Sequence, residues 1–204
     1  MSRIVIFGAG GRGGRAAVAE ARRRGHEVTA VVRDPAAHPD LDAHVIAGDV
    51  TDPASVAAAS RGHDAAINST YAADADPAAF FPAAARALLA GLAAPRLVSV
   101  GVASVIPAAS GELLMDTPGY PQEYRAFLLA HQAGDEVFQK ADTDLDWLVI
   151  SPSGDFDHEG TPTGRYRLAP GDAASRITYA DFALALLDEI ETPRHHRTHI
   201  GVEA

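Results

Sequence analysis

A glycine cluster between a strand-like run and a helix-like run most constrains what this chain can fold into. Residues 4–7 are β-branched or aromatic, a pattern typical of a strand buried on both faces of a parallel sheet. Residues 8–14 contain five glycines, and an alanine-rich run that predicts a helix continues to Arg24. Residues 27–32 then predict a second strand. A strand–loop–helix–strand unit of about 30 residues predicts a βαβ unit.

The glycine loop has the spacing of a dinucleotide-binding turn. It matches G-x-x-G-x-x-G at Gly8, Gly11 and Gly14. The first glycine permits a tight turn, the second lets backbone N–H groups approach a pyrophosphate, and the third lets the helix pack closely on the sheet. The positive end of the helix then faces the anion. The loop therefore predicts a nucleotide site, with Gly10 and Gly13 beside it.

The alternation of strands and helices continues through most of the chain. Further strands are expected at residues 43–47, 64–68, 97–100, 147–150 and 198–202, and further helices at residues 53–60, 77–91, 121–141 and 180–191. This order predicts a Rossmann-like, doubly wound α/β fold with a mostly parallel sheet and helices on both faces. We expect one NAD(P)-binding domain over residues 1–204, with residues 152–178 forming a substrate-side loop region.

Composition excludes several kinds of site. The net charge of −10 argues against a nucleic-acid partner, which needs a basic surface. The chain has no cysteine, which removes disulfides, thiolate nucleophiles and cysteine-ligated metals. Its one lysine, Lys140, follows Gln139, so a phosphate-binding P-loop is absent. No apolar run approaches the ~20 residues of a membrane span, and no signal peptide is evident, so a cytoplasmic protein without a membrane partner is expected.

The end of the second predicted strand bears on the choice between NAD and NADP. Arg33 stands there, where an arginine accommodates the 2′-phosphate of NADP. Arg12 lies inside the glycine loop and could reach the same phosphate. Asp34 is the competing detail, because an acidic residue at this point bonds the ribose 2′-hydroxyl of NAD. The two arginines favour NADP(H) over NAD(H).

Residues 4–35 resemble the nucleotide-binding half of the atypical short-chain dehydrogenases, a group that includes NmrA-like proteins and the flavin reductase or biliverdin reductase B type. Similar segments recur at residues 47–52, 68–70, 145–147, 151–153, 163–166, 175–177 and 179–181. With the glycine loop, the resemblance implies a set of cofactor-binding residues: Gly8, Gly10, Gly11, Arg12, Gly13, Gly14, Arg33, Asp49, Val50, Asn68, Ser69, Thr70, Val100, Gly101, Pro152 and Ser153.

Two departures from that group affect the expected chemistry. The usual Tyr-x-x-x-Lys pair needs a tyrosine at position 136, which is Glu136, and Gly101 and Val102 stand about where the catalytic serine would fall. Flavins and quinones accept a hydride and can take their proton from water, so the leading hypothesis is an NADPH-dependent reductase of such a small molecule. An NADP(H)-sensing binding protein and an epimerase or isomerase remain alternatives.

Few side chains could donate a proton. The candidates are Tyr124 and His131 on the predicted helix 121–141, and His158 in the loop expected to border the substrate. Tyr71 could stack on a substrate ring. Residues 195–199 hold three histidines but lack the spacing of a zinc enzyme, so no metal is expected. The resemblance implies a monomer or weak homodimer.

Overall fold

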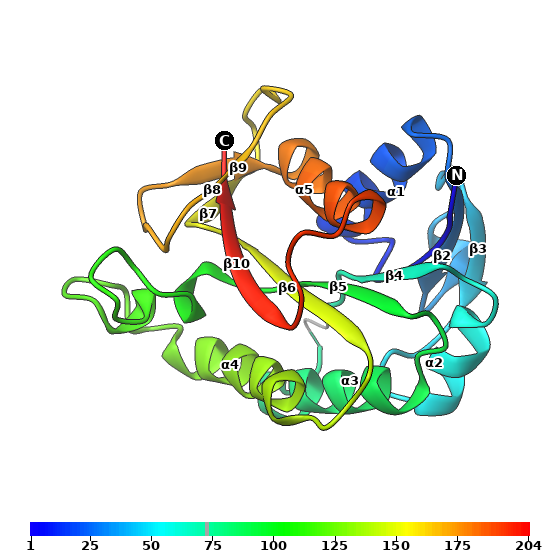
Figure 1. The fold of residues 1–204 in the computed structure, drawn as a ribbon, viewed down its shortest axis with the longest axis horizontal. Helices are drawn as coiled ribbons and strands as arrows, with labels where there is room; N and C mark the ends of the chain where they lie inside the picture. Colours follow the sequence, from blue (N-terminus) through cyan, green and yellow to red (C-terminus); the bar gives the residue numbers. More distant parts are fainter. Residues whose placement is uncertain (72–73) are drawn as a thin grey trace.

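The computed structural model describes residues 1–71 and 74–204 and contains an eight-stranded sheet (Figure 1). The strand order is β3-β2-β1-β4-β5-β6-β10-β8, and only the pairing of β8 with β10 is antiparallel. A separate pair, β7 with β9, is parallel. The strands are β1 (Arg3–Phe7), β2 (Glu27–Val32), β3 (His44–Ala47), β4 (Ala65–Asn68), β5 (Arg96–Val100), β6 (Asp146–Pro152), β7 (Asp155–Asp157), β8 (Arg167–Leu168), β9 (Arg176–Thr178) and β10 (Thr198–Glu203).

In the described part of the chain, five α-helices cover the two faces of the sheet (Figure 1). Helices α1 (Arg12–Arg23) and α5 (Tyr179–Glu191) pack on one face, while α2 (Pro53–Ser60), α3 (Pro77–Gly91) and α4 (Arg125–Lys140) pack on the other. Alternate residues of β1 feed the two layers of core: Ile4 and Ile6 contact the α1/α5 layer, and Val5 and Phe7 the opposite layer. The Rossmann-like α/β fold expected from the sequence is confirmed.

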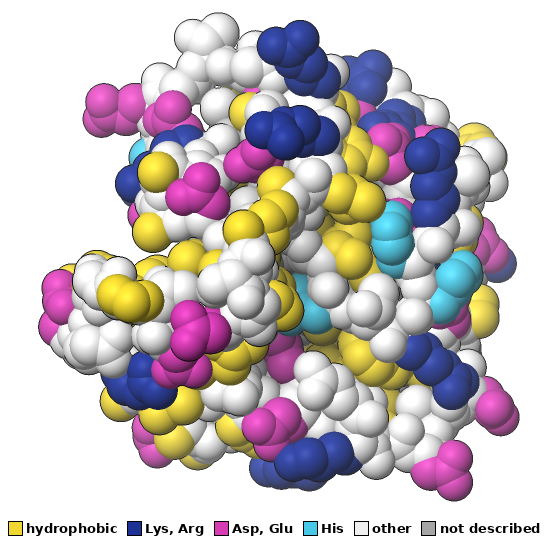
Figure 2. Space-filling model, turned by 60° about the vertical axis from the view of Figure 1, so that its left-hand side comes forward, with side chains coloured by type: hydrophobic (Ala, Val, Ile, Leu, Met, Phe, Trp, Pro, Cys, Tyr) yellow, Lys and Arg dark blue, Asp and Glu magenta, His cyan; other side chains and the backbone are white. Residues whose placement is uncertain are grey.

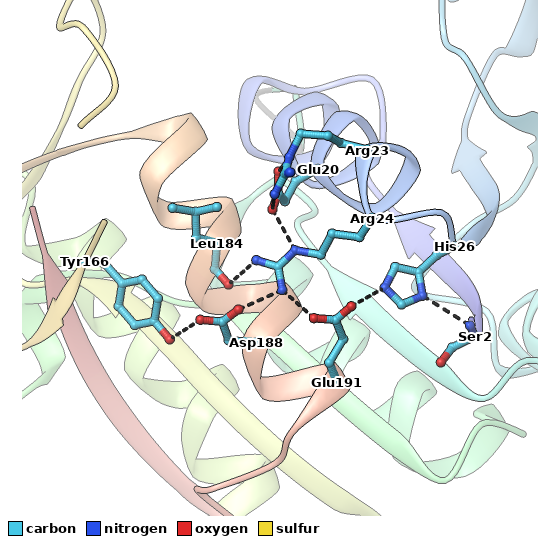
Figure 3. Close-up of polar contacts among 9 residues, drawn as sticks. All are labelled: Ser2, Glu20, Arg23, Arg24, His26, Tyr166, Leu184, Asp188 and Glu191. Atoms are coloured by element: carbon cyan, nitrogen blue, oxygen red, sulfur yellow. Dashed lines mark hydrogen bonds and ion pairs between the residues drawn. The ribbon is translucent and has the colours of Figure 1, made fainter. Parts of the chain in front are cut away.

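A polar cluster centred on Arg24 joins α1 to α5 (Figure 3). The Arg24 guanidinium donates to Glu20 at 2.6 Å, to Asp188 at 2.7 Å and to Glu191 at 2.6 Å. Glu191 also lies 2.9 Å from His26. Nδ1 of His26 accepts a hydrogen bond from the backbone N–H of Ser2. The cluster therefore ties the end of the first helix and the start of β1 to the last helix.

One predicted boundary was wrong. The helix expected over 121–141 begins at Arg125, because the Gln122 side-chain amide just before it donates to the backbone carbonyls of Met115 and Tyr120. Within residues 152–178, for which the sequence specified no strand, the structure has β7, β8 and β9; β7 pairs with β9, and β8 pairs with β10. In Figure 1 the segment between β5 and α4 projects beyond the sheet. Among the described residues, no helix combines the length and apolar character needed to cross a bilayer.

Candidate functional site

A cavity of about 950 Å³ opens at the carboxyl ends of β1 to β5. These ends contribute Phe7, Val32, Asp49, Ser69 and Val100 to its lining. The chain order reverses beside β1, and ligands of open α/β sheets bind at such a reversal. Figure 2 shows histidine and hydrophobic side chains together on the face it presents, next to a projecting lobe. The volume is in the range of small-molecule and cofactor pockets.

The glycine loop forms one end of this cavity, and its backbone geometry requires glycine. Gly8 has φ +74°, and a β-carbon there would lie 2.4 Å from the carbonyl oxygen of Ser69. A β-carbon on Gly14 would lie 2.1 Å from the carbonyl oxygen of Gly8. Helix α1 starts at Arg12 with no side-chain cap and no acidic residue in its first turn. Its N-terminal N–H groups therefore suit an anion such as a pyrophosphate.

Where the cavity meets the end of β2, Arg33 forms an ion pair with Asp74. Its guanidinium donates to both carboxylate oxygens of Asp74, at 3.1 and 3.2 Å. Asp34 is not among the cavity-lining residues, and its carboxylate accepts from the backbone N–H of Ala36 at 3.0 Å, capping a short helical turn. Of these two neighbouring residues, Arg33 therefore lines the cavity and Asp34 does not.

Arg12 contacts His158 across the cavity mouth. The Arg12 NH1 atom lies 2.8 Å from Nδ1 of His158, and both residues line the cavity. A guanidinium has only donors, so Nδ1 must be the acceptor. In this contact the ring proton of His158 lies on Nε2.

Two groups of aromatic rings face the cavity. On one side Phe127 contacts Tyr71 edge-on at 5.9 Å between centroids and contacts His131 at 4.9 Å. On the other side Phe156 stacks on Tyr179 with centroids 4.2 Å apart and planes 14° apart. All five residues line the cavity. Such rings offer flat apolar surfaces to a planar ligand.

His131 is packed between aromatic rings on the inner side of α4. Its ring lies 3.6 Å from that of Phe81, centroid to centroid. Burial lowers the pKa of His131 to about 3, and the charge of His199 contributes in the same direction. His131 is therefore neutral at physiological pH and could donate or accept a hydrogen bond, but it is not an imidazolium acid.

This depressed pKa predicts an acid-side loss of stability. The unfolded chain binds a proton on His131 below about pH 6.5 while the folded chain does not, so the free energy of unfolding falls as the pH drops from about 6.5 towards 3. Wild type should lose up to about 1.4 kcal/mol per pH unit more than His131→Phe in that window. Urea unfolding at pH 7, 5.5 and 4.5 measures the difference. Parallel pH dependences for the two proteins would contradict a buried neutral His131.

The structure brings most of the sequence-predicted residues to the cavity. Those that line it are Gly8, Gly10, Gly11, Arg12, Gly13, Arg33, Asp49, Val50, Ser69, Thr70, Tyr71, Val100, Gly101, His131 and His158. Five others lie outside the lining. Gly14 is a packing contact, Asn68 bonds Ser99 and Thr70, and Pro152 and Ser153 are buried at the end of β6. Tyr124 precedes α4 with its side chain 65% exposed.

Several lining residues were not predicted. They are Phe7, Val31, Val32, His38, Gly48, Phe80, Phe127, Phe156 and Tyr179. His38 lies over the glycine loop, where its Nε2 would be 2.4 Å from a β-carbon on Gly10, and Arg15 NH2 lies 3.2 Å from its Nδ1. A lone histidine or phenylalanine carries no sequence signal of this kind, because the contact depends on tertiary packing.

The histidines of residues 195–199 each face a carboxylate of their own. His195 lies 2.6 Å from Glu189, His196 2.9 Å from Asp146, and His199 3.1 Å from Asp135. In the part of the chain that the structure describes, no three metal-binding side chains gather around a common point.

Comparison with known proteins agrees with this geometry. A family model described as NAD(P)H-binding matches residues 8–193. This chain belongs to that NAD(P)H-binding family. It is 35% identical to an uncharacterized protein, YwnB, of Bacillus subtilis (strain 168), over 98% of this chain and 97% of the relative.

Two crystal structures share the fold over the full length of this chain. A presumed exported protein from Burkholderia pseudomallei is 36% identical, with a TM-score of 0.85 and 100% of both chains covered. A presumed NADH-flavin reductase from Streptococcus pneumoniae TIGR4 is 29% identical, with a TM-score of 0.85, covering 100% of this chain and 99% of that one. The chain is thus similar over its full length to a reductase-type protein.

Proposed function

We propose that this protein is an NADPH-dependent reductase that delivers a hydride to a flavin, a quinone or another flat conjugated small molecule. The observation that carries the proposal is the position of the two aromatic groups in the same cavity as the glycine loop. A dinucleotide with its pyrophosphate at the start of α1 would extend along the strand ends towards Gly101, and the rings would then flank its partner. The similarity to a presumed NADH-flavin reductase supports the same class of acceptor.

The protonation state of His131 also favours such an acceptor. Burial keeps its ring neutral. The nicotinamide supplies the hydride when it is bound, and the residues around it hold the acceptor against it and limit access of water. Reduced flavins and quinones are stable enough to collect their proton from solvent, so a site whose buried histidine is neutral can serve them.

Preference for NADPH rests on Arg33 and Arg12. Arg33 lines the cavity, while the Asp34 carboxylate is engaged by its own short turn. Asp74 now holds Arg33, but an exposed ion pair contributes little, and a dianionic phosphate would displace the carboxylate.

Substitution of Arg33 tests this preference. Arg33→Ala should weaken NADPH binding by roughly tenfold or more, as expected for the loss of a charge-assisted hydrogen bond, and leave NADH binding nearly unchanged. Asp74→Asn frees the same guanidinium and should strengthen NADPH binding a few-fold. Fluorescence titration with both nucleotides measures these changes. Equal effects of Arg33→Ala on NADPH and NADH would contradict phosphate recognition at this point.

Turnover with a panel of acceptors tests the reaction itself. Under anaerobic conditions we expect NADPH oxidation with oxidised flavins or quinones and none with simple ketones, which need a protein acid. Tight NADPH binding with no oxidation by any acceptor would favour a sensing protein. Change of a sugar-like substrate without net NADPH consumption would favour an epimerase or isomerase.

A further inference from the structure

His131 is held in the cavity wall by its neighbours on α3 and α4. Phe127, His131 and Gly134 follow one another at helical spacing, so they lie on the same side of α4. A β-carbon on Gly134 would lie 3.0 Å from the β-carbon of Phe81, so the glycine lets α3 approach α4 closely. The Phe81 ring then packs against the imidazole with centroids 3.6 Å apart, and the Phe127 ring meets it edge-on at 4.9 Å. Packing therefore fixes the orientation of the imidazole.

The ring nitrogens of His131 have no hydrogen-bond partner in the described part of the chain. Neither nitrogen is among the fully buried atoms that lack a partner there. Because His131 lines the cavity, its nitrogens are available to a ligand. A ligand that fills the cavity displaces the water around a polar group, so a well-bound ligand has to supply the replacement hydrogen bond.

The charge state of His131 decides what it can offer a ligand. Burial keeps the ring neutral, so it has one N–H donor and one nitrogen acceptor. Since no described residue hydrogen-bonds to either nitrogen, the ligand selects which of them carries the proton. The N–H group suits a carbonyl oxygen, which is the polar group that flavins and quinones have in common.

His199 places His131 near Gly101. The Nε2 atom of His199 would lie 3.1 Å from a β-carbon on Gly101, and His199 is close enough to His131 to contribute to lowering its pKa. In the proposed arrangement the dinucleotide extends from the glycine loop towards Gly101, which brings its reactive end to this part of the cavity. His131 is thus on the side of the cavity where the acceptor would lie.

We propose that His131 is a catalytic residue that donates a hydrogen bond from its neutral ring to a carbonyl oxygen of the acceptor. The proposal rests on the proposed function. During transfer a C–H bond of the reduced nucleotide breaks and the hydride forms a new bond to the acceptor, so the nucleotide is oxidised and the acceptor is reduced. The electron pair displaced within the acceptor moves towards the oxygen that His131 binds, and a proton from solvent neutralises it afterwards. A donor fixed in place stabilises that developing charge.

Variants of His131 that differ in hydrogen bonding test the proposal. His131→Phe keeps a ring between Phe81 and Phe127 but has no donor, so kcat with a flavin or a quinone should fall about tenfold or more. His131→Asn and His131→Gln place an amide N–H near the position of Nδ1 or of Nε2, so one of them should lose less than His131→Phe. NADPH affinity should stay close to wild type in these variants. Leu129→Gln, at an exposed position of α4 outside the cavity lining, is the matched control.

An acceptor without a carbonyl oxygen separates this role from general damage to the site. N-methylphenazinium is a flat hydride acceptor with no such oxygen, so wild type and His131→Phe should reduce it at similar rates once its direct reaction with NADPH is subtracted. Infrared difference spectra of bound oxidised flavin with ¹³C-labelled carbonyls give a readout without turnover. We expect a carbonyl stretch at lower frequency in the wild type than in His131→Phe.

Four results would each overturn the proposal. They are an unchanged kcat in His131→Phe, an equal loss with N-methylphenazinium, losses in both His131→Asn and His131→Gln as large as in His131→Phe, and a carbonyl stretch that does not differ between wild type and His131→Phe. Wild-type protein that turns over none of these acceptors would instead overturn the proposed function. Wild-type turnover that is insensitive to the side chain at this position leaves the proposed function standing and removes only the role of His131.

Discussion

Replacing Gly14 with alanine is expected to destabilise the protein by about 3 kcal/mol or more and to abolish dinucleotide binding. The added β-carbon would lie 2.1 Å from the carbonyl oxygen of Gly8 and 2.7 Å from the α-carbon of Ala9. Both are backbone atoms of the loop, so relief requires α1 to move away from β1. That movement would also withdraw the N-terminus of the helix from the cavity. Urea unfolding and NADPH titration measure the two effects.

Gly11→Ala is the matched control within the same loop. A β-carbon there meets the Gly8 carbonyl oxygen at 3.5 Å, an ordinary contact, so unfolding free energy should change by less than about 1 kcal/mol. Gly11 lines the cavity, however, and the added methyl group should weaken NADPH binding. Equal stability of Gly14→Ala and Gly11→Ala would contradict the close helix–strand packing described above.

Removal of the Arg24 side chain should have the second largest effect. Arg24→Met keeps most of the aliphatic stem but leaves Glu20, Asp188 and Glu191 without the cation they share. The Arg24 side chain is only 14% exposed, so water cannot fully replace it. Breaking a buried ion pair costs about 3–5 kcal/mol, and because two of the carboxylates are partly exposed we expect about 2–3 kcal/mol here. Thermal and urea unfolding measure the loss.

Arg23 provides the comparison for that experiment. It bonds the same Glu20 but is exposed, and in the described part of the chain it forms no hydrogen bond or ion pair with α5. Arg23→Met should therefore change stability by less than about 1 kcal/mol. If the two substitutions destabilised the protein equally, the cluster in Figure 3 would not be a specific link between α1 and α5.

The fold could be predicted because the hydrophobic periodicity of strands and helices and the positions of glycines are local features of the sequence. The buried strand at residues 4–7, the glycine loop and the helix after it each leave a signature within a few residues. The C-terminal part of the chain was harder to predict from its sequence. The short strands β7 and β8 pair with β9 and β10, and at three and two residues they are too short for their own sequences to specify a strand.

The candidate site could also be predicted only in part. The backbone positions of the glycine loop and strand ends follow from the βαβ pattern, and the structure brings Arg12, Arg33 and Gly101 to one cavity. The partners of those residues do not follow from it. His158 lies against Arg12, Asp74 pairs with Arg33, and the aromatic walls combine α4 with the segments of β7 and α5. Such pairs are set by tertiary packing alone.

Direct hydride transfer inside this cavity is the central claim, and anaerobic single-turnover mixing tests it most directly. Enzyme loaded with one equivalent of NADPH would be mixed with one equivalent of oxidised flavin, and the absorbance of both would be followed. The account predicts that NADPH and oxidised flavin disappear together, in equal amounts and at one rate, and that the rate slows when the transferred hydrogen is deuterium. NADPH that stays bound and reduced in the presence of flavins and quinones would contradict it.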